Sequence, residues 1–187
     1  MSINVHDNFL TPEEHQFVFN YCKNASYFYG ESDNERQGEA FCTGLVHEVY
    51  FADDKIPEEN TQVFGGGHSK TINPKKFYNI FVDKIEDKFP QMKKLDMYRM
   101  YVNCFAPSEQ PYFHTDGSDD EYTFLYYPNM DWDVDRGGET QFFVDNTFYG
   151  VVPTPNRIVL FDASLLHKAT SFRDRHRFTV AIKYGIA

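Results

Sequence analysis

Two apolar runs flank a polar connection in residues 157–184, which read RIVLFDASLLHKATSFRDRHRFTVAIKY. The first run, 157–162, and the last, 177–184, have the length and apolar character of β-strands. His167 follows the first run after a short turn, and Arg177 begins the second run. His167 can therefore lie at the mouth of a sheet, and Arg177 can face into the sheet's interior.

Similar short runs recur upstream of this stretch. They cover 95–104, 122–127, 139–144 and 148–152, and turn residues separate them, including Asp116–Asp119, Gly137-Gly138 and Pro153–Asn156. Many short strands at such spacing indicate a sandwich or a barrel. The high aromatic content, 18% of the chain, also suits a β-rich core.

The N-terminal half predicts two helices and one strand. Thr11 can cap the first helix, with Pro12 at its first position and Glu14 completing a capping box. The apolar face of this helix consists of Phe17, Val18, Tyr21 and Cys22. The second helix has a stripe formed by Phe77, Ile80, Phe81 and Ile85 and ends at Pro90. Residues 44–51 read as a strand.

Residues 52–71 combine Asp, Pro and Asn with the run Gly65–Gly67. This composition predicts a mobile loop. The loop is either a plain surface connection or a lid that closes over an active site.

Length and charge narrow the classes of function. A chain of 187 residues fits one domain with a sizeable core. The net charge of −10 disfavours nucleic acid as a partner.

The three cysteines, Cys22, Cys42 and Cys104, form no disulfide or zinc pattern and are expected to be free thiols. No leader or membrane-spanning stretch is evident, so we expect a soluble protein in the reducing cytoplasm, without a membrane partner. The oligomeric state is left open.

One short motif carries the metal chemistry. His114-Thr115-Asp116 is the only H-x-[DE] in the chain, and on an extended segment its first and third side chains share a face. With His167, these residues supply two imidazoles and one carboxylate. That set leaves three adjacent positions open on an octahedral ion, as in the facial triad of non-haem iron(II) oxygenases. We therefore predict that His114, Asp116 and His167 are metal ligands and form the catalytic centre.

Arg177 offers a site for an anion. A dicarboxylic cosubstrate needs a cation at its far end, and a guanidinium can bind a carboxylate through two parallel hydrogen bonds. Thr179 lies two residues further along the same strand face and can add a hydroxyl. Taken singly, His114 could be a turn residue, His167 a core histidine and Arg177 a surface ion-pair partner.

Beyond these patterns, the sequence resembles the 2-oxoglutarate/Fe(II) dioxygenase superfamily. It is most similar to the prolyl 4-hydroxylase-like branch, which includes small bacterial and phage members. The resemblance extends from about Asn8 to Tyr184. It rests on 98–103, His114-Thr115-Asp116, 123–129, Gly137-Gly138-Glu139-Thr140-Gln141-Phe142, 153–161, His167 and 177–184.

The resemblance implies a fold and a set of cofactors. The fold is a double-stranded β-helix, a cupin-like jelly roll, with 1–92 as helical support and lid loop and 93–187 as the jelly-roll core of a single domain. The cofactors are Fe(II), 2-oxoglutarate and O₂, and the family admits ascorbate as an additional reductant. Tyr127 is expected to donate a hydrogen bond to the carboxylate that Arg177 binds, and Tyr101 and Asn103 are expected to line the cosubstrate pocket. Core packing is the alternative role for Tyr101 and Tyr127.

The implied activity is hydroxylation of a C–H bond, with succinate and CO₂ as products. Asp116 keeps the carboxylate ligand that halogenating relatives lack. A prolyl residue in a peptide or protein is the favoured substrate, and a free amino acid or another small molecule is the first alternative. A cupin-type metal-binding module without oxygenase activity is the alternative from a different class. Position 183 is Lys where some prolyl hydroxylases have Trp, which leaves the substrate open. If a phage encodes the chain, the expected compartment is the host cytoplasm.

Overall fold

The computed structural model describes residues 3–29, 44–64, 68–107, 109 and 111–186. The helices are α1 (Pro12–Asn24) and α2 (Pro74–Lys88), with 3-10 turns at Pro90–Lys94 and Val134–Arg136. The strands are β1 (Asn4–His6), β2 (Phe28–Tyr29), β3 (Leu45–Phe51), β4 (Asn60–Phe64), β5 (His68–Ile72), β6 (Asp96–Phe105), β7 (Tyr122–Tyr127), β8 (Thr140–Val144), β9 (Thr147–Val151), β10 (Arg157–Asp162), β11 (His167–Ala169) and β12 (Arg177–Gly185).

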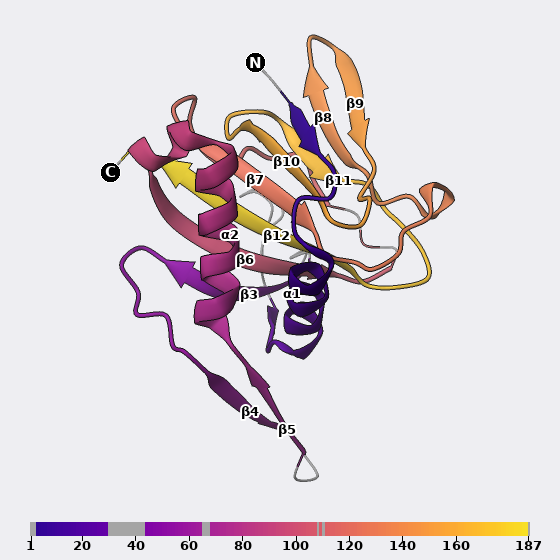
Figure 1. Ribbon diagram of the computed structural model, residues 1–187. Coiled ribbons are helices and arrows are strands. Elements are labelled where there is room, and N and C mark those ends of the chain that lie inside the picture. The colour runs from indigo at the N-terminus through magenta and orange to yellow at the C-terminus, as the bar shows by residue number, and fades with distance from the viewer. Residues whose placement is uncertain (1–2, 30–43, 65–67, 108, 110, 187) are drawn as a thin grey trace.

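Two antiparallel sheets form the body of the molecule (Figure 1). The larger sheet has the strand order β1-β10-β7-β12-β6-β3-β2, and the smaller has the order β11-β8-β9. Strand β12 lies at the centre of the larger sheet, between β7 and β6. The arrangement confirms the predicted mainly β fold, a jelly roll with N-terminal helices.

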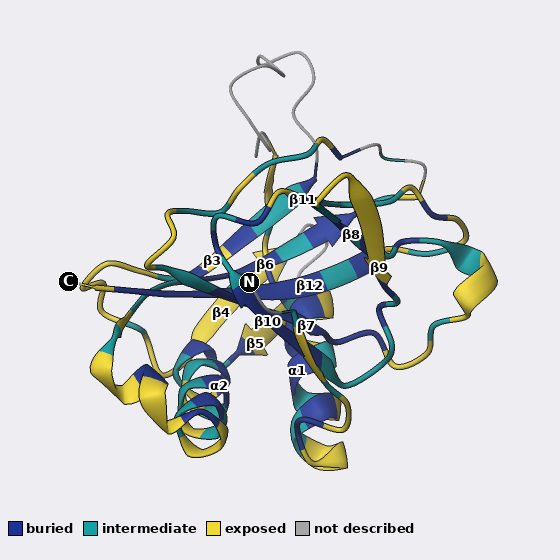
Figure 2. Cartoon of the chain, turned by 90° about the horizontal axis from the view of Figure 1, so that it is seen from above, coloured by how far each residue is buried: buried dark blue, intermediate teal, exposed yellow. Residues whose placement is uncertain are grey.

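The larger sheet is covered on both faces (Figure 2). Helices α1 and α2 cover one face, and the smaller sheet lies over the other. Each face has its own apolar core. The core under the helices includes Val18, Phe77, Phe81, Ile85, Phe124, Val180 and Ile182, and the core between the sheets includes Leu125, Phe142, Val159, Phe161 and Ala181. Strand β12 contributes to both, because alternate side chains of a strand point to opposite faces.

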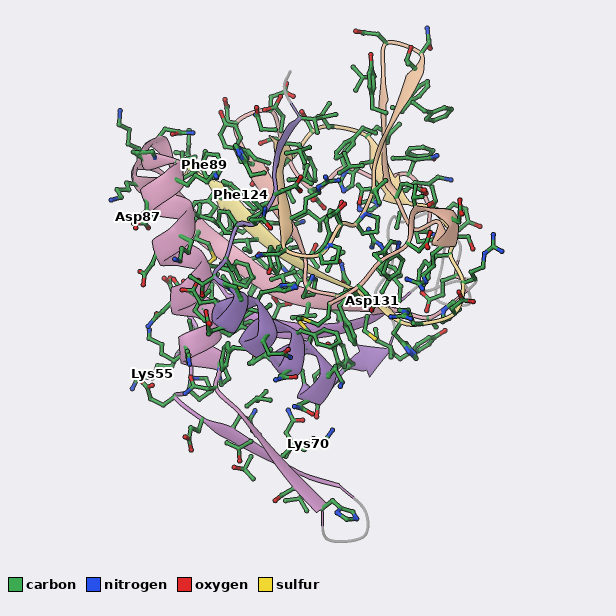
Figure 3. All side chains as sticks on the ribbon, turned by 45° about the vertical axis from the view of Figure 1, so that its right-hand side comes forward. Lys55, Lys70, Asp87, Phe89, Phe124 and Asp131 are labelled. Carbon is green, nitrogen blue, oxygen red and sulfur yellow. The ribbon has the colours of Figure 1, made fainter. Side chains whose placement is uncertain are left out.

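Both predicted helices form, for the predicted reasons. The Thr11 hydroxyl accepts a hydrogen bond from the Glu14 backbone N–H, and the Glu14 carboxylate accepts one from the Thr11 N–H, which completes the capping box. Helix α2 ends just before Pro90. At that end Phe89 packs against Phe124 of β7, with ring centroids 5.3 Å apart (Figure 3).

The predicted irregular loop at 52–71 is wrong in part. Residues 60–64 and 68–72 pair as the antiparallel hairpin β4–β5, whereas Gly65–Gly67 lie outside the described residues. The hairpin extends beyond the helices in Figure 1, and β5 contacts α1. Its base therefore lies on the helical face of the larger sheet, and closure over a ligand stays a prediction.

Two smaller predictions concern thiols and membranes. Cys22 and Cys104 are free and buried, while Cys42 lies outside the described residues. In the described part of the chain, neither helix has the length and apolar character needed to cross a membrane.

Candidate active site

His114 and His167 lie opposite each other, held by the backbone. Each N–H donates to the other residue's carbonyl, with N···O distances of 3.0 and 2.9 Å. Residues directly opposite each other in an antiparallel pair present their side chains on the same face. The two imidazole rings are accordingly neighbours, with centroids 4.5 Å apart.

Local carbonyl groups set the tautomer of both rings. Nδ1 of His114 lies 3.0 Å from the Tyr112 carbonyl oxygen, and Nδ1 of His167 lies 2.8 Å from that of Leu165. A carbonyl can only accept, so each Nδ1 carries the proton and each Nε2 offers a lone pair. Burial lowers the pKa of His167, against the opposing effect of the nearby Asp116 carboxylate. His167 is therefore neutral at pH 7, as a metal ligand must be.

Asp116 brings the carboxylate to the same place. Its backbone N–H donates to the Ala163 carbonyl at 2.8 Å, which fixes the loop after His114 against the segment that leads to His167. Its Oδ2 accepts from the Thr123 hydroxyl at 2.8 Å, and its Oδ1 accepts from Lys183 Nζ at 3.1 Å. The carboxylate is only 7% exposed.

The three predicted ligands come together in the structure. Nε2 of His114 lies 3.8 Å from Oδ1 of Asp116, and Nε2 of His167 lies 3.6 Å from Oδ2. All three ligand atoms lie within 4.8 Å of one another. Burial disfavours the charged form of Asp116, but His167, Lys183 and His114 and the hydrogen bond from Thr123 outweigh it and lower the pKa to about 2. One anionic oxygen and two imidazole lone pairs therefore face a common centre and fit a divalent transition metal.

Arg177 lies in the interior between the sheets and is 2% exposed. Its Nε donates to the Gly138 carbonyl at 2.8 Å, and its Nη2 donates to the Thr140 hydroxyl at 3.1 Å. Burial lowers the pKa of the guanidinium below its ordinary value. Among the residues that the structure describes, no carboxylate forms an ion pair with Arg177. The guanidinium thus donates only to neutral acceptors, and the Glu139 carboxylate attracts it without forming an ion pair.

Tyr127 joins the same cluster, although through Thr140. Its hydroxyl donates to the Thr140 oxygen at 2.8 Å, and its ring lies 5.5 Å from the Arg177 guanidinium carbon. The Thr140 oxygen thus accepts from two groups, which leaves its own proton to donate. The Arg177 guanidinium and the Thr140 hydroxyl can therefore both donate to an anion, whereas the Tyr127 proton is directed to Thr140 and not to the anion itself.

The remaining predicted residues line the interior. Thr179 of β12 is 1% exposed and pairs with Asn103 of β6. Ala181 pairs with Tyr101, which belongs to the core between the sheets. Since cross-strand partners share a face, Thr179, Asn103 and Tyr101 face the same side as Arg177. Their contact with a cosubstrate stays a prediction.

Three residues at the site had no assigned role in the sequence. Thr123 and Lys183 hydrogen-bond to Asp116, and Thr140 connects Arg177 with Tyr127. A signal existed for two of them. Lys183 lies six residues after Arg177 on the same face of an alternating strand, and Thr140 stands within the Gly-Gly-x-Thr-x-Phe segment.

Two histidines and one carboxylate around a centre with open positions are typical of non-haem iron(II) oxygenases. A comparison of the sequence with known protein families also indicates an iron(II) oxygenase. Residues 75–184 match the family model described as the 2OG-Fe(II) oxygenase superfamily, and the chain belongs to that family. It is therefore an oxidoreductase whose family uses Fe(II), 2-oxoglutarate and O₂. A search of curated proteins gives no significant match.

Solved structures with the same fold include several prolyl hydroxylases. A Pseudomonas putida prolyl-4-hydroxylase superposes with a TM-score of 0.70 at 13% identity, over 99% of this chain and 92% of that one. The viral collagen prolyl hydroxylase of Paramecium Bursaria Chlorella virus-1, a 2OG complex, gives 0.66 at 16% identity, over 100% and 97%. A Trichoplax adhaerens prolyl hydroxylase, in complex with a hypoxia inducible factor peptide fragment, gives 0.65 at 16% identity, over 98% and 83%.

Proposed function

We propose that this chain hydroxylates a C–H bond of a prolyl residue in a peptide or protein, with His114, Asp116 and His167 holding iron and Arg177 holding 2-oxoglutarate. Bound iron with O₂ and 2-oxoglutarate would supply the oxidising chemistry, and succinate and CO₂ would be the other products. The protein's own contribution is to bind, to orient and to exclude water.

The observation that carries the proposal is the buried charge of Arg177. A guanidinium taken out of water is costly unless it meets an anion or a full set of acceptors. Arg177 meets only the Gly138 carbonyl and the Thr140 hydroxyl among described acceptors. The distal carboxylate of 2-oxoglutarate would supply the missing negative charge, and a metal-only cupin has no need for such a group.

Thr140 and Tyr127 support the same role. Since the Thr140 oxygen already accepts from Arg177 and Tyr127, its proton is directed to a further acceptor. A carboxylate bound at Arg177 would be that acceptor. The two histidines of the proposed metal site are equally preorganised, because the backbone bridge fixes His114 against His167 and each Nδ1 donates its proton to a carbonyl.

The prolyl substrate is the finer part of the proposal. It is supported by three solved relatives in fold that are named prolyl hydroxylases, one of them in complex with a peptide. A hydroxylation screen of a peptide library beside free amino acids tests it, read as a mass gain of one oxygen atom with succinate measured in parallel. Oxygen gain on free amino acids alone would move the assignment to a small-molecule hydroxylase.

The cofactor sites are tested by anaerobic titration. Fe(II) followed by 2-oxoglutarate should give the weak visible charge-transfer band of the chelate in the wild type. His167→Ala and Asp116→Ala should lose metal binding and turnover.

Arg177→Lys should weaken 2-oxoglutarate binding by about tenfold or more, which corresponds to about 1.4 kcal/mol. The reason is that an ammonium cannot form the two parallel hydrogen bonds that a guanidinium forms with a carboxylate. Arg177→Ala should weaken it further, with metal affinity nearly unchanged. Equal 2-oxoglutarate binding in all Arg177 variants would favour the cupin-type module.

A further inference from the structure

Lys183 places a second buried cation in this site, directly on a predicted metal ligand. Its Nζ lies 3.1 Å from Oδ1 of Asp116 and 3.2 Å from the Asp116 backbone oxygen. The side chain is 9% exposed, and its ammonium lies 5.6 Å from the Tyr101 ring centroid. One ammonium thus contacts both the side chain and the main chain of the same residue.

The alternation of β12 explains how the lysine reaches this position. Arg177, Thr179, Ala181 and Lys183 follow one another at every second residue and are all buried between the sheets. Their neighbours Phe178, Val180, Ile182 and Tyr184 pack under the helices. The Lys183 side chain is thus held in the interior, where it forms an ion pair with Asp116.

The two oxygens of Asp116 are held by different donors. Oδ2 accepts from the neutral hydroxyl of Thr123, whereas Oδ1 accepts from the charged ammonium of Lys183. A metal cation is attracted to the oxygen that keeps its negative charge and repelled from the one that carries an ammonium. Oδ2 lies 3.6 Å from His167 Nε2, whereas Oδ1 lies 3.8 Å from His114 Nε2 and also carries the ammonium.

From this asymmetry we infer that Lys183 is a positioning residue that makes Asp116 bind the metal through Oδ2 alone. The inference rests on the proposed metal site. Two imidazoles and one carboxylate oxygen leave three positions of an octahedral ion open. If Asp116 bound through both oxygens, it would occupy one of the positions that the cosubstrate and O₂ require.

Two consequences follow when the ammonium is removed, and they have opposite signs. Lys183→Met deletes a positive charge beside the cation, so divalent metal should bind more tightly. It also frees Oδ1 to bind the metal, so 2-oxoglutarate should bind the Fe(II) protein about tenfold more weakly, which corresponds to about 1.4 kcal/mol. A merely structural lysine would give a different result, because loss of local packing lowers both affinities together.

Lys183→Gln separates the hydrogen bond from the charge. The amide can still donate to Oδ1 but carries no charge. Metal affinity should rise as in Lys183→Met, while 2-oxoglutarate affinity should stay near that of the wild type. Lys84→Met is the matched control, since it removes the same charge from an α2 residue that pairs with Glu14 at 3.4 Å, far along the chain from the site.

The experiment is an anaerobic titration of each variant with Mn(II) alone, then of the Fe(II) form with 2-oxoglutarate, alongside thermal unfolding of the metal-free protein. Opposite shifts in Lys183→Met, with recovery of 2-oxoglutarate binding in Lys183→Gln, support the inference. Wild-type values in both variants, or a joint fall of both affinities, overturn it. A wild type that binds no metal rejects the proposed metal site itself.

Discussion

At the scale of single residues, the sequence pointed to His114, Asp116, His167 and Arg177 and missed the groups that orient them, including the charged Lys183. His114, Asp116, His167 and Arg177 stand out because their chemistry is rare in the interior of a sheet and their spacing fits strands. The Gly-Gly-x-Thr-x-Phe segment marks the position of Thr140 but not its role, because that role depends on which residues lie across from it. Thr140 acquires that role from the fold, which brings β8 beside Arg177 and Tyr127.

Thr140 therefore gives the residue-scale prediction. Thr140→Val keeps the shape but removes the oxygen that accepts from both Arg177 and Tyr127, which leaves two buried donors without this acceptor. The loss should cost about 1–3 kcal/mol of folding stability and should weaken 2-oxoglutarate binding. Thr140→Ser keeps the hydroxyl and should retain most of that binding. Denaturant unfolding and the anaerobic titration measure the two effects, and equal binding in the Val and Ser variants would contradict the role of the hydroxyl.

At the scale of elements, runs with an apolar face were predictable and polar or very short strands were not. The runs predicted at 95–104, 122–127, 157–162 and 177–184 correspond to β6, β7, β10 and β12 nearly residue for residue. The hairpin β4–β5 buries Ile72 but leaves most of its described residues exposed, so its sequence lacks the alternation of a half-buried strand. Strands β1, β2 and β11 have three, two and three residues, too few to show a period.

The glycine turn before β8 gives the prediction at this scale. Gly138 has φ +81°, and an added Cβ would lie 2.9 Å from Trp132 Cζ2 and 3.3 Å from Arg177 Cδ. Gly138→Ala should therefore cost at least about 1 kcal/mol in backbone strain, and it should shift the carbonyl that accepts from Arg177 Nε. We expect a lower melting temperature together with weaker 2-oxoglutarate binding.

Gly150 on β9 provides the control for this change. A Cβ there would meet nothing closer than Glu139 Cβ at 3.8 Å, so Gly150→Ala should alter stability by less than about 1 kcal/mol. It should leave 2-oxoglutarate binding as in the wild type. If Gly138→Ala behaved like Gly150→Ala in both measurements, the turn would not be what holds Arg177 in place.

At the scale of the whole molecule, the fold class followed from the number and spacing of strands, but the strand order did not. The order β1-β10-β7-β12-β6-β3-β2 joins segments from opposite ends of the chain. Such pairings depend on which apolar faces bury one another, and the local sequence does not show this.

The burial of two histidines was likewise not predictable from the local sequence. His15 and His47 are predicted by no motif, yet each is fixed by a tyrosine hydroxyl, that of Tyr126 at 2.5 Å and that of Tyr21 at 2.9 Å.

These histidines make folding stability depend on pH. Burial lowers the pKa of His15, His47 and His167 in the folded protein below the ordinary value. In the unfolded chain a histidine takes up its proton near pH 6.5. Below that pH the unfolded state binds more protons than the folded state, so acidification favours unfolding. The neutral histidines thus contribute fully to folding stability above about pH 6.5. This contribution is lost as the pH falls toward the lowered pKa values of the folded state.

We therefore expect the unfolding free energy of the metal-free protein to change little above about pH 7.5 and to fall between about pH 7 and 5. The slope is at most about 1.4 kcal/mol per pH unit for each proton that the folded state excludes. Carboxylates with a lowered pKa, such as Asp7 and Glu121, also lower the folding stability on acidification, but only in more acidic solution. Urea unfolding at several pH values measures the slope, and His15→Gln and His47→Gln should each flatten it because an amide does not titrate. Stability that rose on acidification over this range would show that these histidines are charged in the folded protein.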